Sequence, residues 1–265
     1  MKKRSTKEIK LQGKKALQGH IGTVVLGILA VYGLNMLGTV LSTNLFSGTS
    51  VLDWILSEVF MLVVSLIVGI ISAGLGYMLL NISRGKEFSL GDLGYFFRNQ
   101  PDRVIIAGFV LAVIQLVTAI PYYYASFTID PGVTIDSQIQ WLSMTLGLLA
   151  VSTLLNFLIS LPFAMTYYCL ADDTELGGIQ ALKESTRMMK GNLWRYVKLN
   201  LSFVPLLLLS VFTFYIALFW IIPYMEMSMA TFYRDLNGEL DHRLPGEGYI
   251  YDYSNNQQDD YNSEA

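Results

Sequence analysis

Long uncharged apolar segments alternate with short charged segments along this chain. At a helical rise of 1.5 Å per residue, about 20 apolar residues cross the roughly 30 Å hydrocarbon core of a bilayer. The pattern therefore predicts an all-α, polytopic membrane protein with six transmembrane helices. The predicted spans cover residues 21–41, 55–80, 104–124, 141–170, 193–212 and 216–233.

The last apolar stretch, 193–233, is too long for one span. As a single helix it would measure about 60 Å, twice the thickness of the hydrocarbon core. Two spans joined by a tight turn near residues 213–215 fit the pattern better. Within the fourth span, Pro162 predicts a kink, because proline removes a backbone donor. In the second span, small residues between Ser65 and Gly76 recur every four positions, which predicts close helix packing.

Charged amphipathic segments precede the odd-numbered spans. They are the N-terminal helix, 1–20, and the loops 81–103 and 171–192. In the third segment an apolar face and a basic face lie side by side at helical spacing. The expected apolar face consists of Ile179, Leu182, Thr186, Met189 and Leu193. Aromatic and basic side chains follow at the membrane boundary, where they are favoured. The candidate lipid-headgroup contacts are Lys183, Arg187, Lys190, Arg195 and Lys198, with Trp194 beside them.

Gly19, Asn99 and Gly191 occupy equivalent positions, each just before an odd-numbered span. Glycine and asparagine tolerate the left-handed conformation that ends a helix, and Asn192 is a favourable N-cap for the next helix. We therefore expect three copies of one unit, an amphipathic helix, an elbow and a hairpin of two spans. The alternative is that any basic helix preceding a span would look similar.

The basic residues fix an orientation. Of the 18 lysines and arginines, seven lie in 1–20, four in 81–103, five in 171–200 and two in 234–265. Cytoplasmic loops carry this excess of positive charge, so six spans place every basic segment and both termini in the cytoplasm. Five spans would leave Arg234 and Arg243 outside. Residues 234–265 are acidic and polar, and we expect a disordered tail.

Composition and motifs argue against an enzyme. The chain is 53% hydrophobic and 15% charged, has one cysteine, Cys169, and places its two histidines near opposite ends. The recognised catalytic and nucleotide-binding motifs are missing, so we expect no catalytic residue, metal or cofactor. Glu58 and Glu226 are ionisable residues within predicted spans, and such residues are candidates for function. Glu226 follows Pro223, but an acid where a helix leaves the membrane would look the same.

The C-terminal third resembles the DUF975 family of bacterial integral membrane proteins. The resemblance rests on a combination of short motifs over about 50 residues. The motifs are Ala181-Leu182, Glu184-Ser185, Met189-Lys190-Gly191-Asn192, Trp194-Arg195, Leu201-Ser202-Phe203, Trp220, Pro223-Tyr224 and Phe232-Tyr233. The chain departs from the family pattern at Pro205-Leu206 and at Ala217-Leu218-Phe219. The resemblance implies a location in the bacterial plasma membrane and a multi-pass topology, with no established activity.

Two functions remain open at this point. The first is a non-enzymatic protein that binds anionic lipid at the inner leaflet or scaffolds other membrane proteins there, because its amphipathic segments are basic. The alternative is a transporter of small molecules or lipids with a site between the spans near Pro223 and Glu226, because transporters are built from repeats and broken helices. Neither function involves nucleic acid.

Overall fold

The computed structural model describes residues 3–48 and 50–241, and these residues form helices without any strand. The predicted disordered tail, 234–265, is partly ordered: residues 234–236 continue α12 and 239–241 form a 3-10 turn, whereas the rest of it lies outside the described residues. The α-helices are α1 (Thr6–Leu17), α2 (Ile21–Leu45), α3 (Val51–Ser83), α4 (Tyr95–Arg98), α5 (Pro101–Thr118), α6 (Ile120–Thr128), α7 (Ile135–Ser160), α8 (Thr166–Asp172), α9 (Gly178–Met189), α10 (Leu193–Leu201), α11 (Val204–Phe212) and α12 (Leu218–Leu236). Three 3-10 turns are η1 (Leu90–Gly94), η2 (Leu161–Phe163) and η3 (Glu239–Asp241).

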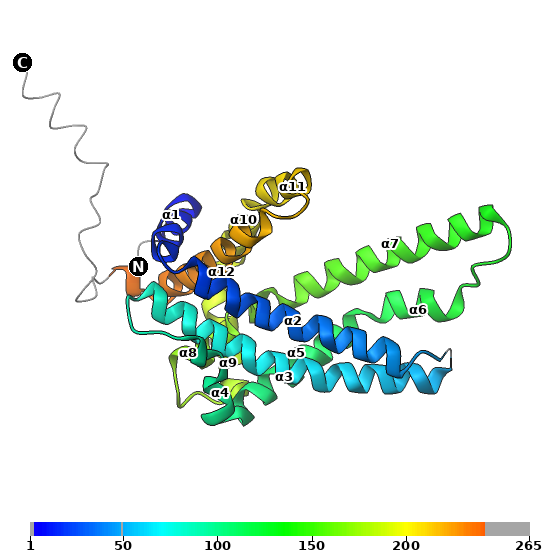
Figure 1. Ribbon diagram of the computed structural model, residues 1–265, viewed down its shortest axis with the longest axis horizontal. Coiled ribbons are helices and arrows are strands. Elements are labelled where there is room, and N and C mark those ends of the chain that lie inside the picture. Colours follow the sequence, from blue (N-terminus) through cyan, green and yellow to red (C-terminus); the bar gives the residue numbers. More distant parts are fainter. Residues whose placement is uncertain (1–2, 49, 242–265) are drawn as a thin grey trace, which may run out of the picture.

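The long helices α2, α3 and α7 run between two ends of the molecule (Figure 1). Helices α1, α4, α8 and α9 gather at one end, whereas the α2–α3 and α6–α7 connections lie at the other. We call the first end the basic end, because the described lysines and arginines fall in the segments located there.

Among the described residues, five segments are long and apolar enough to cross a membrane, so this is a membrane protein. They are Ile21–Leu45, Val51–Ser83, Pro101–Thr118, Ile135–Asp172 and Leu193–Phe212. Helix α12, the expected sixth span, is not one of them, since it carries Glu226, Arg234 and Asp235.

Several apolar segments are broken where proline removes a backbone donor. Helix α7 ends at Ser160, and the 3-10 turn containing Pro162 separates it from α8, as the sequence predicts. A second break separates α5 from α6 before Pro121. A third, between α10 and α11, was not predicted and lies just before Pro205.

The turn expected near 213–215 is present between α11 and α12. Phe214 and Tyr215 both adopt positive φ, at 50° and 66°. Left-handed backbone is costly for side chains of this size, so the tight reversal is held by the rest of the hairpin.

Small residues of α3 pack against α8, which confirms the packing role expected for this stripe. A Cβ added to Gly69 would lie 3.0 Å from the Tyr167 hydroxyl oxygen, and one added to Gly76 would lie 3.7 Å from the Tyr168 ring. Ala73 is fully buried. At the opposite end of α3, Tyr123 of α6 donates a hydrogen bond of 2.8 Å to Glu58.

Candidate functional site

The N-terminal helix α1 lies antiparallel along α12. Arg4 pairs with Asp235 at one end, at 3.3 Å. In the middle, a Cβ added to Gly13 would lie 3.0 Å from the Cα of Ser228, so the two backbones nearly touch. At the other end, Leu17 and Ile221 line the same groove. The apolar face of α1 is therefore buried against protein rather than resting on lipid alone.

The cations of α1 divide into an exposed set and an inward-facing one. Lys7, Lys14 and Lys15 are exposed. Lys10 instead donates to the Ser202 carbonyl oxygen at 3.1 Å and lies 4.0 Å above the centre of the Phe203 ring. Ser202 is at the unpredicted break between α10 and α11, and backbone groups freed in a broken membrane helix need such partners. Lys10 thus ties α1 to the break.

The buried face of α9 differs from the one predicted. Its members are small or medium-sized, and they are Gly178, Ala181, Leu182, Ser185 and Met189. Of the predicted apolar face, Leu182 and Met189 are buried, whereas Ile179 is 45% exposed and Thr186 is exposed. The reason is the closeness of the packing, since a Cβ on Gly178 would collide with the carbonyl oxygen of Arg103 on α5. Size, and not hydrophobicity alone, selects the face.

Ser185 joins α9 to the break after α7. Its hydroxyl donates to the Pro162 carbonyl oxygen at 2.8 Å and accepts from the Met165 backbone N–H at 3.1 Å. Both partners are groups that the broken helix leaves without an intrahelical partner. Neighbouring Glu184 pairs with Arg187 on the surface, at 2.6 Å.

Two of the three predicted elbows have the expected backbone. Gly19 has φ = 82° and Gly191 has φ = 77°. The prediction for Asn99 is wrong: its φ is −123°, and Gln100 carries the positive φ of 53°. The Asn99 side chain and backbone N–H both donate to the Tyr95 carbonyl oxygen. These bonds keep Asn99 at the end of α4, and the reversal moves to the next residue.

Arg195 belongs to an ion pair within the protein, and its contact with lipid headgroups stays a prediction. It pairs with Asp235 and donates to the Arg4 carbonyl oxygen at 2.9 Å. It also donates to the Asn192 side chain at 3.1 Å. Asn192 sits at the N-cap position of α10 without a capping side-chain bond. Its amide donates back to the Met188 carbonyl oxygen at 2.9 Å.

A second ionic cluster joins the ends of α3, α8 and α12. Arg84 lies 2.7 Å from Asp172 and donates through Nε to Glu239 at 2.9 Å. Arg234 also pairs with Glu239, at 3.1 Å. Burial alone would raise the pKa of Glu239, but the hydrogen bond and charge of Arg84 outweigh it and hold that pKa below its ordinary value.

Sequence reasoning missed most of this cluster. Arg84, Asp172 and Glu239 are not among the candidate residues that the sequence indicates. One signal was available: these opposite charges lie at the ends of segments that are expected on the same side of the membrane. Charge alone does not pair them, because pairing depends on how the helix ends meet.

The remaining predicted headgroup contacts lie on the surface of α9 and α10. Lys183 and Lys190 are exposed, and the Arg187 side chain is 78% exposed. Trp194 is 64% exposed, with the Lys198 ammonium nitrogen 5.6 Å from the centre of its ring. Such an indole and cation pair suits the headgroup region.

Pro223 and Tyr224 lie within α12, where Pro223 is buried and the Tyr224 ring packs edge-on against Phe203 at 5.1 Å. Glu226, one turn further on, is partly buried. Its backbone carbonyl lies 3.5 Å from the Tyr168 hydroxyl. The structure therefore places it where α12 meets α8, near the basic end.

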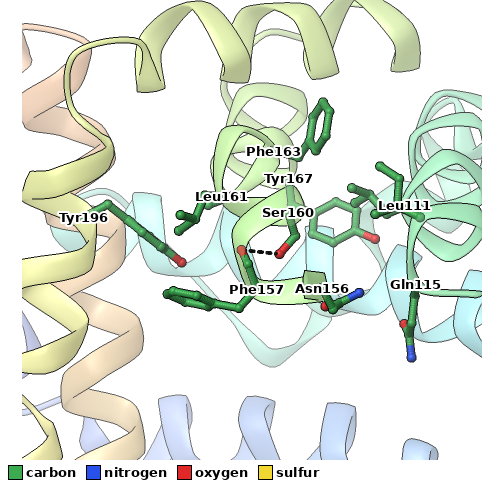
Figure 2. A pocket seen from close by; sticks show the side chains of 11 residues that line it. Leu111, Gln115, Asn156, Phe157, Ser160, Leu161, Phe163, Tyr167 and Tyr196 are labelled. Atoms are coloured by element: carbon green, nitrogen blue, oxygen red, sulfur yellow. Dashed lines mark hydrogen bonds between the residues drawn. The ribbon is translucent and has the colours of Figure 1, made fainter. Parts of the chain in front are cut away.

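A cavity of about 310 Å³ lies where α5, α7, η2 and α10 meet (Figure 2). Asn156, Ser160 and Tyr196 contribute polar groups to its lining. The Asn156 amide already donates to Thr118 at 3.0 Å, and Ser160 to the Phe157 carbonyl. Pro223 and Glu226 do not line this cavity, so it is not the site that the transporter alternative predicts.

Residues 1–239 match the family described as "Protein of unknown function (DUF975)". No curated protein matches the chain, and no solved structure does. The match covers all three amphipathic segments, the two ionic clusters as far as Glu239, and the broken helices between them. This chain belongs to the DUF975 family.

Proposed function

We propose that this chain is a non-enzymatic membrane protein that binds anionic lipid at the inner leaflet of a bacterial plasma membrane. The observation that carries the proposal is that α1 and α9 are both amphipathic. Each buries one face against the apolar helices, and each leaves lysines exposed on the other. A basic residue near an anionic surface contributes about 1 kcal/mol.

The basic end faces the cytoplasm in this proposal, with both termini there. The pairing of Arg4 with Asp235 supports placing the beginning of α1 and the end of α12 on the same side of the membrane, since it brings them together. Other membrane proteins are further candidate partners for the same surface.

We also propose that each of the three amphipathic segments begins one copy of a repeating unit, and that the three copies close into a ring. Each segment packs near the basic end of the second arm of the preceding unit. A Cβ on Gly74 of α3 would collide with the Leu93 carbonyl oxygen of η1. Ser185 of α9 bonds to Pro162, and Gly13 of α1 meets Ser228 of α12. The last contact closes the ring.

The test measures lipid preference in the intact protein. The full chain is reconstituted in nanodiscs of neutral lipid containing a small fraction of spin-labelled phosphatidylglycerol. We expect preferential association that weakens as salt rises, because surface charges are screened within about 10 Å at 0.1 M. Changing four exposed lysines to glutamine should remove most of the preference, and changing them to arginine should preserve it. The four are Lys7, Lys14, Lys183 and Lys190. A neutral lipid carrying the same spin label serves for comparison. If it associated with the unmodified chain as strongly as the labelled phosphatidylglycerol does, the proposal would be contradicted.

A further inference from the structure

We infer that the hairpin formed by α11 and the start of α12 turns inside the inner leaflet, so that the chain crosses the membrane fully four times. The inserted part, residues 204–222, is called the re-entrant hairpin below. This inference rests on the inner-leaflet orientation proposed above. It replaces the fifth and sixth predicted spans with one excursion that presents apolar side chains to the acyl chains of the inner leaflet.

The start of α12 lies at the wrong depth for a full crossing. A groove of about 460 Å³ is lined by Ile21, the first residue of α2, together with Trp220 and Ile221 of α12. Because α2 has 25 residues and measures about 37 Å, its first residue lies near the inner membrane boundary. A helix crossing back from the outer surface would instead begin beside the far end of α2. Figure 1 shows α12 close to the basic end and α11 extending toward the middle of the molecule, short of the other end of α2, α3 and α7.

The lysines of α1 limit the depth of α12. Lys14 lines the same groove, and Lys15 beside it is exposed. Because α1 follows α12 along its length, a fully transmembrane α12 would carry these lysines into the hydrocarbon core. A charge at the centre of a membrane helix costs about 2.5–3.5 kcal/mol on insertion scales. An interfacial α12 avoids this cost.

The length of α11 fits one leaflet. Helix α10 carries Arg195 and Lys198, so the uninterrupted apolar part of this arm is α11 alone, with nine residues. Nine helical residues extend about 14 Å, close to half of the roughly 30 Å core.

The turn itself is built for lipid. Phe212 is 82% exposed, Phe214 88% and Tyr215 59%. Turns in water favour glycine, proline, asparagine, aspartate and serine, as in the 129–134 loop with Asp130 and Gly132. The turn at 212–215 instead exposes aromatic side chains, which are not the residues favoured in water. Acyl chains are the occupant that this surface fits.

Backbone hydrogen bonding supports the same environment. In hydrocarbon every N–H group needs a partner within the protein. Each N–H from residue 213 to residue 218 donates within the hairpin. Tyr215 donates to the Ser210 carbonyl oxygen at 2.8 Å, and Ala217 donates to the Thr213 hydroxyl oxygen at 3.3 Å. The tip therefore satisfies its own donors without water.

Cysteine labelling tests the depth. In a Cys169→Ser background, single cysteines replace Phe214 at the tip, Val133 in the 129–134 loop and Lys190 at the basic end. A membrane-impermeant maleimide is applied to right-side-out and to inverted vesicles. We expect V133C to label only from outside, K190C only from the cytoplasmic side, and F214C from neither side. After denaturation in detergent, F214C should label fully.

Two results would overturn the inference. Labelling of F214C from outside at the rate of V133C would show a complete crossing, and labelling from the cytoplasmic side at the rate of K190C would show a hairpin in water. Quenching of a bimane fluorophore on F214C by brominated lipids adds an independent measure. We expect the strongest quenching by bromines well along the acyl chain, and weak quenching would also overturn the inference. The lysine-to-glutamine variant should label like its parent, so loss of lipid preference and misplacement of the hairpin give separate readouts.

Discussion

At the scale of single residues, the elbow between α9 and α10 depends on the backbone of Gly191. Replacing Gly191 with valine should lower the stability of the protein by at least about 1–2 kcal/mol, because a β-branched residue opposes its φ of 77°. Lys190→Ala is the control, since Lys190 is exposed and contributes one cation among several. The measurement is the thermal transition in detergent.

The middle elbow gives a sharper form of this prediction. Gln100→Gly should be neutral or stabilising, whereas Gln100→Val should destabilise more than Asn99→Val, because Gln100 carries the positive φ. A larger loss for Asn99→Val would place the reversal at Asn99 after all.

The sequence predicts Gly19 and Gly191 correctly because glycine is the residue that best tolerates left-handed backbone. Near Asn99 the same rule is ambiguous, since two polar residues precede Pro101. The choice depends on the hydrogen bonds that Asn99 makes to Tyr95, and those bonds depend on where α4 ends. Such a choice is settled by local geometry that composition does not encode.

At the scale of elements, α9 holds the broken fourth span through Ser185. Ser185→Ala should destabilise the protein by about 1–3 kcal/mol, because it removes an acceptor from the Met165 N–H and a donor from the Pro162 carbonyl in a buried site. Thr186→Ala is the matched control. Thr186 is exposed and bonds only within its own helix, to Leu182. If the two changes had equal effects on the thermal transition, Ser185 would not be holding the broken fourth span in this way.

The sequence indicates the amphipathic helices but not their partners. Helical spacing finds α1 and α9, and Pro162 predicts the break that α9 covers. Leu182 and Met189 of the buried face of α9 were predicted, but Gly178 and Ala181 were not, because helical periodicity weighs large apolar residues. Likewise, no periodic signal shows that Lys10 points inward while Lys14 and Lys15 point outward.

At the scale of the whole molecule, the Arg84–Glu239 cluster should make stability depend on pH. The folded-state pKa of Glu239 lies below its unfolded value of about 4.3. Its contribution is therefore fully present above the unfolded pKa and is lost as pH falls through the folded pKa. The melting temperature of the parent should fall more steeply over that acidic window than that of Glu239→Gln.

Glu184→Gln provides the control for this pH experiment. Glu184 pairs with Arg187, whose side chain is largely exposed, and exposed pairs contribute little. Its pH profile should follow the parent. Parallel profiles for the parent and Glu239→Gln would show that the cluster does not stabilise the folded state in this way.

The overall arrangement is only partly readable from charge. Lysine and arginine counts predict that the charged segments share one side, and the contact between Arg4 and Asp235 agrees with that grouping. Counts of apolar residues, however, cannot separate a hairpin that crosses the bilayer from one that turns within a leaflet. That distinction comes from Ile21 and Ile221 lining the same groove, although they are 200 residues apart in the sequence.

The pairing of α1 with α12 also orders events during synthesis. Arg4 and Asp235 are separated by 231 positions, so at 5–20 residues per second the first helix is made roughly 10 to 50 seconds before its partner. Throughout that interval the Ile9 and Leu17 side chains lack the surface that later buries them. A chain released early would keep them uncovered, available to chaperones and proteases. The first helix can therefore dock onto the last only once translation has passed residue 235.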